Sequence, residues 1–259
     1  MSGFKWQMAR GITDYHVEHV FGRNATVGTT FEIVAPDGIF RTPQFNTGAP
    51  LRIKAGNVND AAGGSGARKV LLIGMDDEYN VLTEQLTLAG ASASATTIGS
   101  YTRLFRAYVT ESGTYAEVGT FSHAGDIIIE TAAGEQWGCI DATDIPRGIT
   151  QIGAFTVPKN IFGDVDIREA YISGYLLTVD SGKSADFIIV RRENANELTA
   201  PYTPMRVIRE HLQVVDAVDV TLDIPLGPYS PGTDISIFTK AVTSAAVTMD
   251  LEITLVKKT

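Results

Sequence analysis

The sequence predicts an all-β protein, a β-sandwich or jelly roll that carries an extended N-terminal arm. Three observations predict this class: short β-rich runs separated by turn residues, almost no helical periodicity, and many Thr, Val, Ile and aromatic residues. Those residue types fit the pleated, half-buried surface of a sheet. We divide the chain into an arm over residues 1–30 and one β-sandwich domain over residues 31–259, since large sandwiches reach this length as single units.

The expected strands follow one another along the chain at turn-spaced intervals. Turn residues bound the early ones: Pro-Asp-Gly at 36–38, Thr-Gly-Ala-Pro at 47–50 and a glycine-rich loop before residue 68. The expected strands span 30–35, 51–56, 68–76, 82–90, 103–110, 126–132, 148–158, 169–180, 185–193, 214–224, 234–242 and 247–258.

The last expected strand has the clearest pattern. Its apolar residues are Val247, Met249, Leu251, Ile253 and Leu255, and the polar residues Thr248, Asp250, Glu252 and Thr254 alternate with them. A period of two predicts a strand with one face on the core and one polar face.

Two segments are the best candidates for helix. Residues 10–21, RGITDYHVEHVF, form the first, and residues 204–212 form the second. In the second segment Met205, Ile208 and Leu212 fall on one side of a helix, but an extended conformation fits equally well.

The first 27 residues mix aromatic and charged side chains without alternation. This pattern predicts an arm that packs on another molecule rather than a strand of the sandwich. Phe4, Trp6 and Tyr15 are its candidate interface anchors, because buried aromatic side chains carry much of an interface's binding energy.

Composition narrows the class of partner. A formal net charge of −9 and the absence of a basic run argue against nucleic-acid binding, which needs clustered Lys and Arg. No apolar run is long enough to span a membrane or to serve as a signal peptide, so we expect synthesis in a cytoplasm. The single cysteine, Cys139, cannot form an intrachain disulfide, and its apolar neighbours predict a buried strand position.

The glycine-rich stretch AGNVNDAAGGSGARKVLLIGMDDEYN, residues 55–80, resembles a phosphate loop only at first sight. It lacks Gly-Lys-Ser/Thr and the G-x-G-x-x-G fingerprint, and a strand rather than a helix follows it. We therefore expect a wide turn between two strands, with glycines at positions of positive φ.

The chain offers no convincing metal or catalytic motif. His16 and His19 would share a helical face, but zinc needs three or four ligands. Glu18 would point elsewhere on the helix, His123 and His211 are distant in sequence, and no Cys is nearby. The acids of residues 75–80 lack the calcium-loop pattern and predict a polar turn. No nucleophile elbow is present, so the sequence predicts no catalytic residue, no cofactor and no enzyme.

A proline-rich stretch, LDIPLGPYSPGTDISIF, spans residues 222–238. Pro225, Pro228 and Pro231 cannot donate to a strand ladder, and Tyr229 lies between them. The stretch predicts a rigid crossover between two sandwich strands. A surface loop used for contact, with Tyr229 as an anchor, is the compatible alternative.

Residues 51–135 resemble a recurring type of structural protein of tailed-phage virions. The matching elements are Gly66-Ala67-Arg68, Gly74 with Asp76, Glu84 to Gly90, Arg103 to Arg106, and Ser112 with Gly125 to Ile129. The stretch DIPLGPYSPGTDISI matches more loosely. The chain departs from the pattern at residues 113–124, GTYAEVGTFSHA, which are longer than the usual turn.

This resemblance implies a non-enzymatic virion protein, most simply a capsid decoration or cement protein assembled in the host cytoplasm. Its implied partners are the major capsid protein and copies of itself, as a homotrimer or another ring-symmetric oligomer, without nucleic acid or membrane. The alternative is a tail or head-fibre component that binds a receptor or glycan. Tyr101, Tyr108, Tyr115 and Trp137 are candidate members of such a patch. A polysaccharide hydrolase is the third hypothesis.

Overall fold

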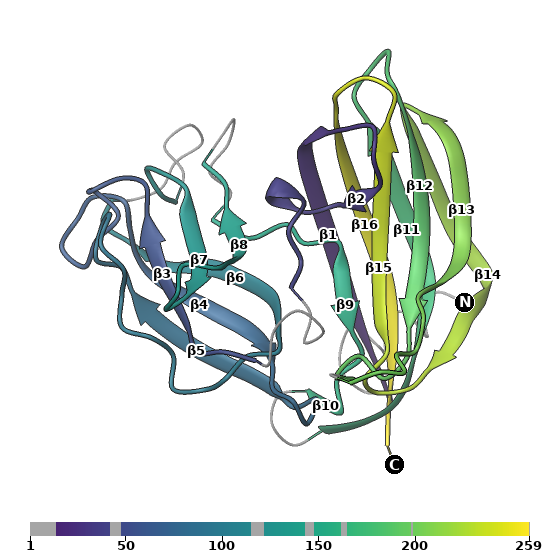
Figure 1. Cartoon of the computed structure of the whole chain (residues 1–259), viewed down its shortest axis with the longest axis horizontal. Helices are drawn as coiled ribbons and strands as arrows, with labels where there is room; N and C mark the ends of the chain where they lie inside the picture. The colour runs from purple at the N-terminus through teal and green to yellow at the C-terminus, as the bar shows by residue number, and fades with distance from the viewer. Residues whose placement is uncertain are drawn as a thin grey trace. The chain divides into compact units, whose positions relative to one another are not determined.

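A computed structural model describes residues 14–41, 48–114, 122–142, 148–161, 165–197 and 199–258. The described residues form an all-β protein whose named strand pairs are antiparallel, which confirms the predicted class (Figure 1). The chain divides into two compact units. Unit 1 comprises residues 1–38, 78–81 and 153–259, and unit 2 comprises residues 39–77 and 82–152.

Unit 1 contains two five-stranded sheets. The first has the order β1-β16-β11-β10, with β14 also paired to β11, and the second has the order β13-β12-β15-β2, with β9 also paired to β15. The elements are β1 (Tyr15–Val27), β2 (Glu32–Ile33), the 3₁₀ turn η1 (Pro36–Gly38), β9 (Ala154–Thr156), β10 (Asn160–Ile161), β11 (Val165–Val179), β12 (Ser184–Arg192), β13 (Arg206–Val215), β14 (Ala217–Tyr229), β15 (Asp234–Ala241) and β16 (Ala245–Lys257).

Both sheets contribute to one buried apolar cluster, which gives unit 1 its core. The predicted alternation of residues 247–258 is confirmed, because Val247, Met249, Leu251, Ile253 and Leu255 are all 2 % exposed or less. Strand β16 lies between β1 and β11, so its backbone pairs on both sides. The cluster spans the two sheets because alternate residues of each strand point to the same side.

Unit 2 contains two three-stranded sheets, with the orders β3-β7-β8 and β5-β4-β6. Its strands are β3 (Leu51–Ala55), β4 (Ala67–Met75), β5 (Val81–Thr87, the first residue of which is assigned to unit 1), β6 (Arg103–Ser112), β7 (Ile127–Thr131) and β8 (Gln136–Ile140). Cys139 is buried in β8, as predicted.

Neither candidate helix is a helix where the structure describes it. Residues 15–21 belong to β1, and residues 206–212 belong to β13, which is the extended alternative for that segment. Residues 15–27 form β1, which pairs along its length with β16, and residues 206–215 form β13, which pairs with β12. A short helix is marginal by itself, so a long antiparallel ladder and core packing outweigh weak helical spacing. The expectation that residues up to 27 avoid the sheet is therefore wrong for β1. Residues 1–13 lie outside the described residues.

The glycine-rich loop joins β3 to β4, so the expected turn between strands is confirmed. Its glycines serve a different purpose from the expected one, since Gly63, Gly64 and Gly66 do not have positive φ. A Cβ atom on Gly64 would lie 2.0 Å from the carbonyl oxygen of Asn59, and one on Gly66 would lie 2.1 Å from Asp60 Oδ1. Close approach within the loop, rather than backbone handedness, requires glycine at these two positions.

Asp60 holds this loop from the inside. Its side chain is fully buried, and its two carboxylate oxygens accept four backbone contacts. Ala67 N–H donates to Oδ1 at 2.8 Å, Gly125 N–H donates to Oδ2 at 2.9 Å, and Ala124 N–H lies 2.9 Å and 3.1 Å from the two oxygens. One carboxylate therefore joins the start of β4 to the segment that precedes β7.

We predict that Asp60→Asn destabilises unit 2 by about 2–4 kcal/mol, because hydrogen bonds to a buried charged group are strong. The amide NH₂ would face backbone N–H donors where an acceptor is needed. Urea unfolding followed by the fluorescence of the buried Trp137 measures the change. Asp166→Asn makes the same chemical change at an exposed position and should cost little. Equal stability of the two variants would contradict the assignment.

Candidate interaction surface

Strands β13 and β14 follow one another in the chain but belong to different sheets. Asp216, in a left-handed conformation with φ of 60°, connects them. Among the described strands β13 pairs with β12 alone and β14 with β11 alone, so each leaves one backbone edge unpaired. An unpaired edge is a place where another chain can add contacts.

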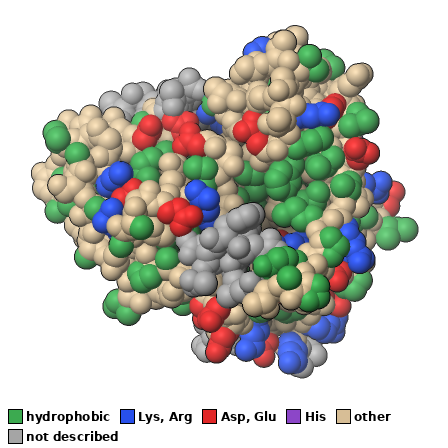
Figure 2. Space-filling model, viewed as in Figure 1, with side chains coloured by type: hydrophobic (Ala, Val, Ile, Leu, Met, Phe, Trp, Pro, Cys, Tyr) green, Lys and Arg blue, Asp and Glu red, His purple; other side chains and the backbone are tan. Residues whose placement is uncertain are grey.

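Large apolar side chains are exposed on these two strands. On β13, Val207 is 56 % exposed, Leu212 60 % and Val215 54 %, and Ile224 on β14 is 83 % exposed. Figure 2 shows hydrophobic side chains among charged ones at the right-hand margin, the side on which Figure 1 draws β13 and β14. Contiguous apolar exposure marks interaction surfaces more often than scattered single residues do. We name these two strands the β13–β14 edge.

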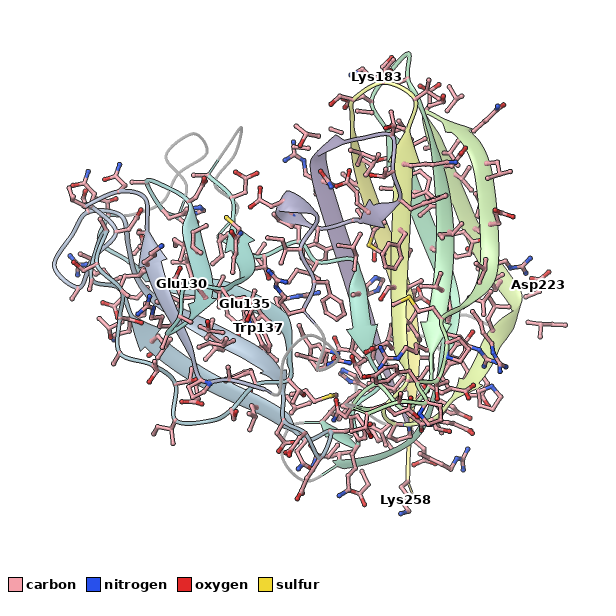
Figure 3. All side chains as sticks on the ribbon, viewed as in Figure 1. Glu130, Glu135, Trp137, Lys183, Asp223 and Lys258 are labelled. Atoms are coloured by element: carbon pink, nitrogen blue, oxygen red, sulfur yellow. The ribbon has the colours of Figure 1, made fainter. Side chains whose placement is uncertain are left out.

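Strand β14 bulges away from its neighbour in the middle of this edge. Thr221 is opposite Gly174 and Leu226 is opposite Ile172, so residues 222–225 face Ser173 alone. Within the bulge Pro225 has no N–H to donate. Figure 3 shows Asp223 directed away from the ribbon of β14. The bulge therefore projects side chains outward rather than extending the ladder.

Charges on the edge separate by strand. Arg206 and Arg209 are exposed on β13, whereas Asp219 and Asp223 are exposed on β14. Within the described ranges none of the four forms a salt bridge. Glu210 is also exposed on β13, but it points to the opposite face from its neighbour Arg209. Arg206 shares the face of Arg209, because the strand has a register shift between them, opposite Ile189 and Val190.

A tyrosine–histidine pair links β13 to β11, the strand that pairs with β14. Tyr175 lies on β11 opposite Val220 of β14, and its hydroxyl is 2.7 Å from Nε2 of His211 on β13. The two rings meet edge to face, with centroids 5.4 Å apart. Burial lowers the pKa of His211, and the positive charge of Arg209 lowers it further. Burial also raises the pKa of Tyr175.

Two of the four predicted anchors lie within the described residues. Phe4 and Trp6 lie outside the described residues. Tyr15 is the first residue of β1, half-buried and opposite Val256. Tyr229 is 3 % exposed and lies in the core of unit 1, with the Arg191 guanidinium 5.8 Å from its ring centroid. Its burial removes it from the surface because β14 ends there and the chain crosses to β15.

That crossover confirms the leading interpretation of the proline-rich stretch, since β14 and β15 belong to different sheets of unit 1. Pro225 and Pro228 lie within β14 itself, which an edge strand tolerates. These prolines were the signal in the sequence that could have located the edge. The sequence did not indicate the surface of β13, because the spacing of its apolar residues suits a helix as well as a strand.

The aromatic patch expected for glycan binding does not form from the described residues. Tyr101 is fully buried and Trp137 is 1 % exposed, while Tyr108 is half-buried on β6. Tyr115 lies outside the described residues. Both buried residues fill the core of unit 2, and burial raises the pKa of the Tyr101 hydroxyl.

The histidines of β1 do not share a face as a helix would have placed them. His16 Nε2 lies 2.8 Å from Glu18 Oε1, whereas His19 Nδ1 lies 3.4 Å from Asp250 Oδ1 on β16. A strand puts residues three apart on opposite faces. No group of three or more His, Cys, Asp or Glu among the described residues is arranged to hold a metal ion.

A serine–histidine contact in unit 2 has the chemistry of a nucleophile pair but not the arrangement. Ser122 Oγ lies 2.8 Å from Nδ1 of the buried His123. Both oxygens of the nearby Asp60 accept backbone N–H groups. Burial lowers the pKa of His123, although the charge of Asp60 opposes this shift. The pair therefore lacks the oriented acid that a catalytic triad needs.

Three of the hollows that described residues line have mixed polar and apolar linings. One of about 300 Å³ lies beside Asp186 and Lys240, and one of about 230 Å³ lies over β11, β14 and β16 beside His19 and Asp219. The third, of about 670 Å³, is lined by small and apolar residues around Ala62 and Leu88. No helix in the described part of the chain is long and apolar enough to cross a membrane.

Comparisons with known proteins add little to this geometry. The chain matches no family model and no curated protein. Among solved structures it is similar to a chain in a structure of infectious bursal disease virus, Gx strain, at 11 % identity. The match covers 93 % of this chain and 72 % of that chain, with a TM-score of 0.24. A TM-score this low does not establish a shared fold.

We predict that the stability of unit 1 decreases as pH falls through about 6.5, the ordinary histidine pKa in an unfolded chain. The folded state resists protonation of His211 because its pKa is lowered, so the unfolded state binds the proton first. Urea unfolding between about pH 8 and 5.5 measures this slope. His211→Gln should reduce the slope while retaining a polar partner for Tyr175. An unchanged slope in that variant would show that His211 is not its source.

Proposed function

We propose that this chain is a non-enzymatic structural component of a virus particle, with a jelly-roll-like sandwich in unit 1. The observation that carries the proposal is the β13–β14 edge, where two strands, each with one unpaired backbone edge, expose apolar side chains and unneutralised charges. A protein whose role is assembly needs such a surface on a rigid antiparallel framework. The resemblance of residues 51–135 to tailed-phage virion proteins supports the choice of particle.

Within that class we propose a capsid decoration or cement protein that binds the major capsid protein and copies of itself. Each contact would be modest, and particle symmetry would multiply the contacts through avidity. Bridging the joints between capsid subunits would help the shell resist the pressure of packaged DNA. The net charge of −9 suits a protein that contacts protein rather than nucleic acid.

The absence of enzymatic activity is part of the proposal. Among the described residues, the polar contacts that resemble catalytic groups serve the fold, since Asp60 accepts backbone donors and His123 is buried. Neither the sequence nor these contacts require a cofactor.

We predict that the purified protein binds intact heads of its virus in numbers matched to the major capsid protein, on the order of hundreds of copies per particle. Quantitative mass spectrometry of virions gives the ratio. A dozen or so copies would instead place the protein at the tail or a single vertex and support the fibre alternative. Cleavage of capsule polysaccharide by the purified protein would contradict a purely structural role.

A further inference from the structure

We propose that the β13–β14 edge binds a second copy of this chain, across a two-fold axis that runs parallel to the two strands. This arrangement opposes β13 of each copy to β14 of the other. It rests on the self-association included in the proposed function, and it names the surface and the symmetry. It predicts a dimer in place of the expected homotrimer. The contact of β13 with β14 forms twice in this dimer, once on each side of the two-fold axis.

Charge complementarity selects a second copy as the occupant. Both exposed arginines of the edge, Arg206 and Arg209, lie on β13, and both exposed aspartates, Asp219 and Asp223, lie on β14. An arrangement that opposed β13 to β13 would bring like charges together. The proposed two-fold brings Arg209 of one copy to Asp223 of the other, at both ends of the contact.

The residues of opposite charge also lie at matching levels along the strands. The Tyr175–His211 contact gives a common reference position along the two edge strands. Tyr175 is opposite Val220 of β14, and its hydroxyl forms a hydrogen bond with His211 of β13. Away from the turn at Asp216, Arg209 lies two residues beyond His211. Asp223 lies in the bulge opposite Ser173, which is two residues beyond Tyr175 on β11. A two-fold axis parallel to the strands preserves level, so Arg209 of one copy faces Asp223 of the other.

Apolar groups fill the same contact. The bulge of residues 222–225 carries Ile224, which is 83 % exposed. The opposing β13 of the second copy would present Val207 and Leu212, each more than half exposed. Burying these side chains supplies the non-directional attraction, and the charges set the register.

Analytical ultracentrifugation and light scattering of the full-length protein test the proposal directly. The expected mass is twice the chain mass of 27.8 kDa, and Ile224→Glu should reduce it to the mass of one chain. Ile98→Glu is the matched control, because Ile98 is 97 % exposed but belongs to unit 2, in the segment between β5 and β6, and to neither strand of the edge. Unchanged circular dichroism and melting temperature would show that both variants fold.

A monomeric wild-type protein at all accessible concentrations would overturn the inference, as would a dimer that Ile224→Glu leaves intact. A trimer that dissociates on the same substitution would overturn the two-fold arrangement. Binding to virus heads is measured separately: a dimer that never binds heads contradicts the proposed function and leaves this inference standing. An intact Ile224→Glu dimer that no longer binds heads would assign the edge to the capsid protein.

A charge exchange tests the register. We predict that Arg209→Asp or Asp223→Arg alone raises the dimer dissociation constant about tenfold or more, because each substitution opposes like charges. The double variant should recover most of the loss, since the exchanged charges attract again. Failure of the double variant to recover, with both single variants folded and weakened, would contradict the Arg209–Asp223 pairing.

Discussion

Backbone hydrogen bonding is the constraint on which the rest of this structure depends. A chain built from antiparallel sheets must pair every strand on both sides, leave an edge to solvent, or satisfy the freed groups in another way. Strand β16 meets the constraint with a partner on each side, and its alternate residues then fill the core of unit 1. Strands β13 and β14 each pair with a neighbour on one side only. Their unpaired backbone edges belong to the candidate interaction surface.

Unit 2 satisfies the same constraint with a side chain where strands cannot pair. The loop between β3 and β4 folds too tightly for a regular ladder, so Asp60 supplies acceptors to three backbone N–H groups from two segments. Gly64 and Gly66 make this possible, because any larger residue would collide with the backbone of Asn59 or with the carboxylate itself. The stretch that resembles a phosphate loop thus supplies a carboxylate that accepts hydrogen bonds from the backbone of its own chain.

The β13–β14 edge hinders strand addition by an arbitrary chain and still presents side chains for a specific contact. Pro225 and the bulge of residues 222–225 prevent continuous strand addition along part of β14, as edge strands of soluble proteins often require. The same bulge presents Ile224 and Asp223, so recognition depends on side chains rather than on any available backbone. Behind it the Tyr175–His211 bond holds the two sheets at a fixed level, which gives the charges of both strands a defined register.

The sequence by itself determined the all-β class, the alternation of residues 247–258, the turn at the glycine-rich loop and the buried position of Cys139. These features follow from local periodicity and composition, which depend only on residues close together in the sequence. Tertiary structure alone decided that residues 15–27 and 206–215 are strands, because their partners β16 and β12 are far away in sequence. It also decided that Tyr229 is core and Ile224 is surface, although both belong to one strand. A bulge set by pairing with β11 determines which side chains point outward, and no local pattern encodes a distant partner's register.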